Sequence, residues 1–210
     1  MAGRKPWEQG GTVRQRNARP RRRVLIVCED EKSSRDYFQS FDPSRTEVIA
    51  VGTGMNTLSL VEEAIDLRNG AQRDGAPYAS VWCVFDRDSF PAQNYHQAFE
   101  RARDEGLRVA WANEAFELWY LLHFNYLDTA LPRDRYAEKL APLLGVAYDK
   151  ADASIYARLE ARQPTALRNA HRLEQHWADL GVNDQERHNP STGVHRLVEH
   201  LNELKELGRA

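Results

Sequence analysis

The sequence has few cysteines and no long apolar run. Its two cysteines, Cys28 and Cys83, lie inside short apolar stretches, where a thiol behaves as a small hydrophobic side chain. This usage excludes a disulfide framework and a cysteine-rich zinc module. No stretch approaches the roughly 20 apolar residues that span a bilayer, and no charged-then-apolar signal segment opens the chain. We therefore expect a cytoplasmic protein that does not enter a membrane.

The charge of the chain is unevenly distributed. The 210 residues are 41% hydrophobic and 29% charged, which is typical of a globular protein with one α/β domain and an appendage. Eight basic residues and one acid give residues 1–23 a net charge of +7, and the chain total of −2 leaves −9 for the rest. We predict that residues 1–22 form a disordered basic arm. This arm either orders on a phosphate backbone or an acidic partner, or is a solvated tail without a ligand.

Four mostly apolar segments of strand length alternate with helical patterns. The segments are residues 24–28, 47–51, 81–85 and 107–112. Strands that alternate with helices of ten or more residues predict parallel pairing through right-handed crossovers. The predicted fold class is therefore α/β, with a mostly parallel sheet of about four strands.

Acidic residues follow two of these strands. Glu29 follows the first strand, and Asp86 and Asp88 follow the third. Ligands of parallel sheets bind at the carboxyl ends of the strands, and the alternation of an extended chain sends the side chains of Asp86 and Asp88 to the same side. Converging carboxylates suit a hard divalent cation. In the alternative, Asp86 caps a turn and Asp88 caps the next helix.

Three further residues lie near the predicted strand ends. Lys32 lies at the start of a helix, where free backbone N–H groups bind phosphate or carboxylate readily. Glu117 lies among aromatic residues in a predicted buried helix, so its carboxylate either has a metal or basic partner or caps the first turn. We expect His123, in the same segment, to be a hydrogen-bonded core or rim histidine and not a ligand.

From Pro132 onward the pattern is helical. The predicted helices span roughly residues 132–144, 152–162, 164–180 and 192–207. The last helix has a single apolar stripe, which packs either on the core or on another chain. Before this helix, the Asn-Pro-Ser-Thr sequence of residues 189–192 offers a helix cap, and His195 follows on the first turn.

Four motifs occur in a fixed order along the chain. They are Leu25-Ile26-Val27-Cys28-Glu29, Phe85-Asp86-Arg87-Asp88, Phe116-Glu117-Leu118-Trp119 and Asn189-Pro190-Ser191-Thr192. In this order they resemble the RloB-like proteins of the Toprim group, over nearly the whole chain from Arg23 to Leu204. The resemblance implies a Toprim-like Rossmannoid core at residues 23–130 and a helical C-terminal extension at residues 131–210 packed on that core. It also implies a role in prokaryotic antiphage defence, as in abortive infection, often beside an ATPase partner.

The resemblance also implies a chemistry. In Toprim enzymes a strand-end Glu and an Asp-x-Asp pair hold Mg²⁺ for phosphodiester chemistry, and these roles fall on Glu29, Asp86 and Asp88. The leading hypothesis is a nuclease that uses Mg²⁺, or Mn²⁺, to cleave DNA or RNA. Glu29 either binds the metal or serves as general base. Lys32 contacts phosphate, and Glu117 completes an outer metal shell.

Several alternatives stay open at this point. Asn189 and His195 are further candidate binding residues. Asp30 stands where the family usually has Gly, so it either belongs to the site or caps the following helix. The rival function is a catalytically silent Toprim-like module that binds nucleic acid or a partner ATPase as a sensor or regulator, and a nucleotidyl transferase of primase type is a third hypothesis. Assembly into a homo-oligomer is also open.

Overall fold

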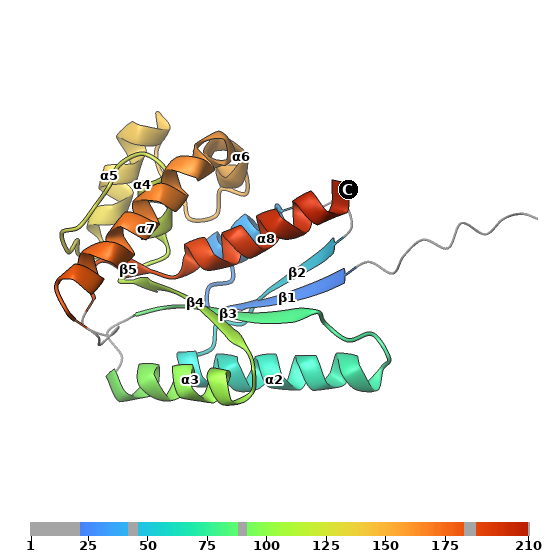
Figure 1. The fold of residues 1–210 in the computed structure, drawn as a ribbon. Helices are drawn as coiled ribbons and strands as arrows, with labels where there is room; N and C mark the ends of the chain where they lie inside the picture. Colours follow the sequence, from blue (N-terminus) through green and yellow to red (C-terminus); the bar gives the residue numbers. More distant parts are fainter. Residues whose placement is uncertain (1–21, 42–45, 88–91, 183–187, 210) are drawn as a thin grey trace, which may run out of the picture.

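A five-stranded sheet crosses the centre of the structure, which is a computed structural model (Figure 1). The strands are β1 (Arg22–Cys28), β2 (Thr46–Gly52), β3 (Ser80–Asp86), β4 (Arg108–Asn113) and β5 (Ser191–Thr192). Their order across the sheet is β2-β1-β3-β4-β5, and every neighbouring pair is parallel except β4 and β5. The prediction of an α/β fold with a mostly parallel sheet is confirmed. The fifth strand was not predicted, because two residues are too few to show a periodic pattern.

The structure describes most of the chain but not all of it. The described residues are 22–41, 46–87, 92–182 and 188–209. Arg22 begins β1, and the rest of the predicted basic arm lies outside the described residues. Asp88 also lies outside them, so its predicted place beside Asp86 stays a prediction.

Helices cover both faces of the sheet (Figure 1). One face carries α2 (Thr57–Arg73) and α3 (Ala92–Asp104). The other carries α1 (Ser33–Gln39), α4 (Glu117–Leu122), α5 (Arg135–Leu144), α6 (Ile155–Leu159), the short 3₁₀ helix η2 (Glu160–Arg162), α7 (Gln163–Asp179) and α8 (Val194–Arg209). The predicted C-terminal helices are therefore present, and β5 lies between the last two and joins the sheet.

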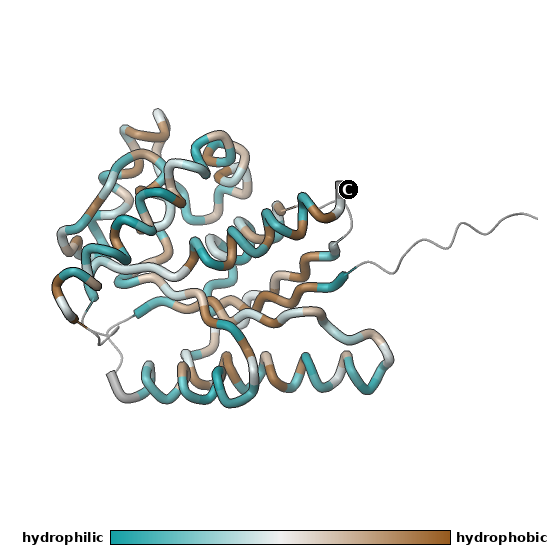
Figure 2. Tube along the Cα trace, in the orientation of Figure 1, coloured by the Kyte–Doolittle hydropathy of each residue, from teal (hydrophilic) through white to brown (hydrophobic). Residues whose placement is uncertain are grey.

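The core consists of two apolar layers, one on each side of the sheet. Alternation along β1 supplies both layers, because Ile26 contributes to the cluster under α4, α7 and α8, while Leu25 and Val27 contribute to the cluster under α2 and α3. Figure 2 shows that hydrophobic residues are concentrated in the strands, whereas they alternate with polar residues along α2 and α3. A strand buried on both faces is uniformly apolar, which is why the sequence reveals these strands.

The burial of the last helix decides between its two predicted packing partners, the core and another chain. Five residues of its apolar stripe are buried in the core, namely Val194, Leu197, Val198, Leu201 and Leu204. Packing on the core is therefore confirmed, although Leu207, one turn further, is exposed.

Cys28 and Cys83 are buried free thiols, as predicted. None of the helices in the described part of the chain combines the length and apolar character that crossing a bilayer requires.

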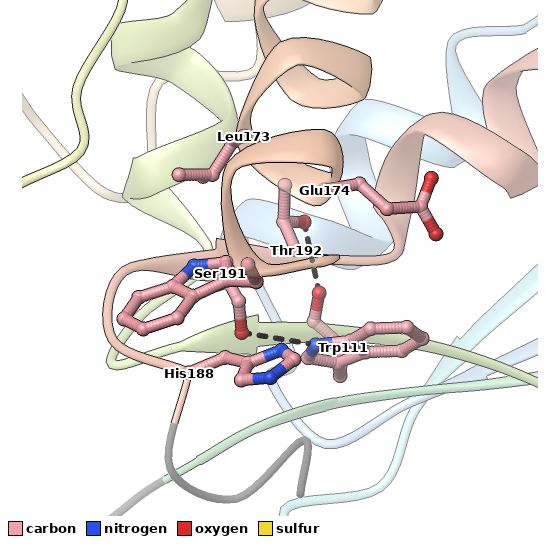
Figure 3. A pocket seen from close by; sticks show the side chains of 7 residues that line it. Trp111, Leu173, Glu174, His188, Ser191 and Thr192 are labelled. Carbon is pink, nitrogen blue, oxygen red and sulfur yellow. Dashed lines mark hydrogen bonds between the residues drawn. The ribbon is translucent and has the colours of Figure 1, made fainter. Parts of the chain in front are cut away.

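The C-terminal segment is held on the sheet by Trp111 of β4. The Trp111 carbonyl oxygen accepts hydrogen bonds from the Gly193 N–H at 2.9 Å and from the Thr192 hydroxyl at 2.8 Å. Its indole N–H donates to Ser191 Oγ at 3.2 Å, and Figure 3 draws both side-chain bonds. Thr192 Oγ1 also accepts the Val194 N–H at 3.1 Å, so a residue of the segment predicted to cap α8 satisfies the first backbone N–H of that helix. A Cβ at position 193 would lie 2.3 Å from the Trp111 ring, which leaves room for glycine alone.

Gly193→Ala tests this close approach. We expect the substitution to lower the free energy of unfolding by about 1–3 kcal/mol, because the new methyl group forces the Trp111 ring or β5 to move. Gly70→Ala is the matched control, since a Cβ inside α2 would meet only the Arg73 guanidinium at 3.9 Å. The control should gain about 0.5–1 kcal/mol from its higher helix propensity. Urea unfolding followed by circular dichroism measures both, and equal gains in the two variants would contradict the packing described here.

Candidate functional site

Acidic residues lie at the carboxyl ends of three adjacent strands. Glu29 follows β1, Asp86 ends β3, and Glu114 comes directly after β4. The backbone N–H of Asp86 donates to Glu29 Oε2 at 3.1 Å, and the Glu29 N–H donates to the Val84 carbonyl at 2.9 Å. The structure therefore brings Glu29 and Asp86 together at the edge where ligands of parallel sheets bind. Glu114 was not singled out from the sequence, although it follows its strand as directly as Glu29 does.

Asp86 has a cationic neighbour. Its Oδ2 lies 3.1 Å from Nη2 of Arg133, a residue that comes just before α5. The Asp86 side chain is only 12% exposed, so this pair lies in a partly desolvated position where ion pairs are screened less than at the surface. Sequence reasoning did not find Arg133, because the chain path from β4 to α5 decides where its guanidinium lies.

Asp30 has one of the two roles that the sequence left open, the helix cap, and it also has a cationic partner. Its Oδ1 accepts the backbone N–H groups of Lys32 at 2.5 Å and Ser33 at 3.0 Å, so it caps the start of α1. Its Oδ2 forms an ion pair with Lys150, in the segment between α5 and α6. Burial alone would raise the pKa of Asp30, but Lys150 and the two N–H donors outweigh burial and hold the pKa below its ordinary value.

This cap changes the expectation for Lys32. The backbone N–H groups of Lys32 and Ser33, proposed from the sequence as phosphate donors, are already occupied by the Asp30 carboxylate. The Lys32 side chain is exposed, and its contact with phosphate stays a prediction.

Glu117 is buried in the first turn of α4. Its Oε1 accepts a hydrogen bond from the Tyr148 hydroxyl at 2.8 Å. This hydroxyl is a partner that the sequence analysis did not name, and the metal or basic partner of Glu117 stays a prediction. Burial, and after it the Glu117 charge, raises the pKa of Tyr148, so this phenol stays protonated and remains a donor.

Lys150 connects the acids electrostatically. Burial lowers the pKa of its ammonium group, but the hydrogen bond and charge of Asp30, together with the charges of Glu117 and Asp86, outweigh burial and raise the pKa.

We call Glu29, Asp30, Asp86 and Glu117 the acidic site. Its carboxylate oxygens are the hard donors that Mg²⁺ prefers, so the residues present fit such an ion.

The remaining candidates lie at different distances from the acidic site. Asn189 lies near the end of β4, where its Nδ2 donates to Glu114 Oε1 at 3.1 Å. His195 lies elsewhere, because β5 runs antiparallel to β4 and leads the chain away from this edge. His123 is buried, with Nδ1 2.9 Å from the Trp119 carbonyl oxygen, and burial lowers its pKa to about 4. The prediction of a core histidine is therefore confirmed.

Comparison with known proteins identifies a family. The family model described as RloB-like protein matches residues 24–201, a span that contains every residue of the acidic site together with Arg133, Tyr148 and Lys150. No curated protein and no solved structure matches the chain.

The Asp30 ion pair predicts a pH-dependent stability. In Asp30→Asn the amide oxygen can still cap α1, but the charge that pairs with Lys150 is lost. Because folding lowers the pKa of Asp30, its stabilisation is present above the unfolded value of about 3.9 and is lost as the pH falls through the folded value. At pH 7 we expect a loss of about 1 kcal/mol, a figure that allows for solvent around the 43% exposed Lys150.

Urea unfolding of wild type and Asp30→Asn at pH 7, 5 and 3 measures this difference. The gap between the two proteins should shrink below about pH 4. Asp66→Asn, an exposed aspartate on α2, is the control and should stay within about 0.5 kcal/mol of wild type at every pH. An Asp30→Asn protein as stable as wild type at pH 7, or a gap that is constant down to pH 3, would show that the pair contributes nothing.

Proposed function

The chain belongs to the RloB-like protein family, and we propose that its acidic site hydrolyses phosphodiester bonds of DNA or RNA with Mg²⁺, or Mn²⁺, as cofactor. The observation that carries this proposal is the hydrogen bond between the Asp86 N–H and Glu29 Oε2, which joins two carboxylate-bearing strand ends at the ligand-binding edge of the sheet. Two cationic side chains, those of Arg133 and Lys150, lie beside these acids.

Three carboxylates would hold the ion. Glu29 and Asp86 come from adjacent strands, and Asp88 would add a third ligand if the chain stays extended after β3. An ion bound here supplies Lewis-acid polarisation of a phosphoryl oxygen and lowers the pKa of a bound water. Glu29 is also the residue that would accept a proton from the attacking water, since its Oε2 already faces the end of β3.

The cationic side chains would bind the substrate. Arg133 and Lys150 are paired with Asp86 and Asp30, and a phosphate group can replace these carboxylates as the hydrogen-bond acceptor. Both residues lie in segments without regular structure that flank α5, where side chains can move with little cost to the core. Tyr148 would position Glu117 through its hydrogen bond, and Glu117 would orient the ligands from a second shell.

The biological setting that we propose is prokaryotic defence against phage. Family membership supports an effector of abortive infection that works beside an ATPase partner. The basic residues before Arg22 supply the positive charge that a nucleic-acid substrate requires, since the rest of the chain is acidic.

A catalytically silent module is the second candidate function. It is favoured by the two ion pairs, Asp30 with Lys150 and Asp86 with Arg133, which neutralise the acids without a metal ion. Such a protein would bind nucleic acid or the ATPase partner as a sensor or regulator. It would show binding without cleavage under every ionic condition, whereas the nuclease cleaves with Mg²⁺ or Mn²⁺ and stops in EDTA.

Asp86→Asn is the direct test of the nuclease. Incubation with mixed DNA and RNA should give cleavage by wild type in Mg²⁺ or Mn²⁺, and a loss of at least about 100-fold in the variant, because a metal ligand has lost its charge. Calorimetric titration should also show weaker Mn²⁺ binding. Asp66→Asn, which alters an exposed aspartate of α2, should cleave like wild type. Undiminished cleavage by Asp86→Asn would remove this residue from the site, and binding without cleavage by wild type would favour the silent module.

Deleting residues 1–21 tests the basic arm. The deletion removes six basic residues and one acid but leaves β1 intact, so the fold should be preserved. Fewer condensed counterions are then released from a duplex, and the plot of log affinity against log salt should become shallower. Fluorescence anisotropy at several salt concentrations measures this slope. If both proteins bind with the same affinity and slope, the arm has no part in nucleic-acid binding.

A further inference from the structure

Two helices place a second group of metal-ligand side chains away from the acidic site. His171 and Glu174 lie three residues apart on α7, and His195 lies on the first turn of α8. One ligand atom from each of the three residues lies within 4.8 Å of the others. We propose that His171, Glu174 and His195 bind a transition-metal ion of the zinc class.

His195 has the features of a ligand without its ion. Its side chain is 1% exposed. Among the described residues Nδ1 has no hydrogen-bond partner, and Nε2 has only the Glu174 carboxylate at 3.4 Å, without the geometry of a hydrogen bond. Buried polar atoms normally have partners, so an imidazole in this position requires an explanation.

The spacing of His195 and Glu174 suits a shared ion. Nε2 of His195 lies 3.4 Å from Oε2 of Glu174. Two ligand atoms that each lie about 2.1 Å from a tetrahedral zinc ion are about 3.4 Å apart. The other oxygen of Glu174, Oε1, is taken by an ion pair with Arg196, so only Oε2 is directed toward the two histidines.

His171 has its ring orientation fixed by Glu199 of α8. Nε2 of His171 lies 2.6 Å from Glu199 Oε1, and Nδ1 lies 3.9 Å from Glu174 Oε2. With the proton on Nε2, this nitrogen donates to Glu199, and the lone pair of Nδ1 is available to a metal ion. A carboxylate that accepts a hydrogen bond from the far nitrogen of a metal-bound histidine is the usual second shell of zinc sites. Zinc geometry requires a contraction of about 0.5 Å for the His171–Glu174 pair and of up to about 1.4 Å for the two histidines. His171 and Glu174 are both exposed, so their side chains can move to make it.

The ligand types select the class of metal. Two imidazole nitrogens with one carboxylate favour Zn²⁺ over Mg²⁺ or Ca²⁺, and three protein ligands leave a fourth position open to solvent. The charged groups around the site are Glu174, Glu199 and Arg196, which leave one net negative charge before the ion binds.

The small pocket beside this group is a separate feature. It is lined by Trp111, Leu173, Glu174, Trp177, His188, Ser191 and Thr192. Figure 3 shows that the Glu174 side chain leads its carboxylate away from His188 and Ser191. The proposed ion would therefore lie outside this pocket, where it would clamp α7 to α8 next to the segment that docks on Trp111.

Metal titration of the full-length protein tests the proposal. After removal of bound metal with a chelator, wild type should bind one Zn²⁺ at this site with an affinity that excess Mg²⁺ does not reduce. Co²⁺ in the same site should show the visible absorption of a tetrahedral complex. His171→Ala, at an exposed position, should lower the Zn²⁺ affinity at least 10-fold, and Glu199→Gln should lower it about 10- to 100-fold.

Two controls separate this site from others. His176→Ala removes a histidine from the same helix outside the cluster, and Asp86→Asn alters the acidic site, and both should keep wild-type Zn²⁺ affinity. The proposal is overturned if wild type takes up no stoichiometric Zn²⁺ or if His171→Ala binds like wild type. Loss of Zn²⁺ binding in Asp86→Asn alone would assign the metal to the acidic site. The result does not depend on cleavage activity, so it is distinguishable from failure of the nuclease.

Discussion

Repulsion among carboxylates at one edge of the sheet is the constraint on which the candidate active site depends. Parallel pairing places the ends of β1 and β3 side by side, where Glu29 follows β1 and Asp86 ends β3. Charges so close are tolerated only when cations or hydrogen-bond donors neutralise them. The segments that flank α5 supply these partners, since Arg133, Tyr148 and Lys150 each contact one of the acids. The C-terminal part of the chain thus completes a site that begins in the sheet.

The same C-terminal part is attached to the sheet by hydrogen bonds to Trp111 of β4 and by close packing at Gly193. The Trp111 carbonyl oxygen accepts hydrogen bonds from Thr192, which ends β5, and from Gly193, which follows it, and Gly193 allows the indole ring to lie against the chain. The docked segment then starts α8 directly after β5, so that α8 lies across the sheet and beside α7. Docking on β4 therefore also brings His195 to the face of α7 that carries His171 and Glu174.

The sequence predicts the elements whose pattern is local. Residues 24–28 are apolar without interruption and form β1, and Glu29 and Asp86 were placed together because strand ends of a parallel sheet share one edge. The partners of these acids were not predictable, because Arg133 and Lys150 lie in irregular segments whose course depends on tertiary packing. Glu117 was expected to need a partner, but the tyrosine hydroxyl that meets this need lies 31 residues further along the chain.

The central claim is that the acidic site binds a divalent ion and a phosphate group together. A crystal structure with Mn²⁺ and an oligonucleotide whose phosphates resist hydrolysis tests this claim most directly, because anomalous scattering locates the ion. The account predicts Mn²⁺ between Glu29 and Asp86, with the Arg133 and Lys150 side chains transferred from their carboxylates to phosphate oxygens. An acidic site without Mn²⁺, with both ion pairs intact and the oligonucleotide bound elsewhere, would contradict it.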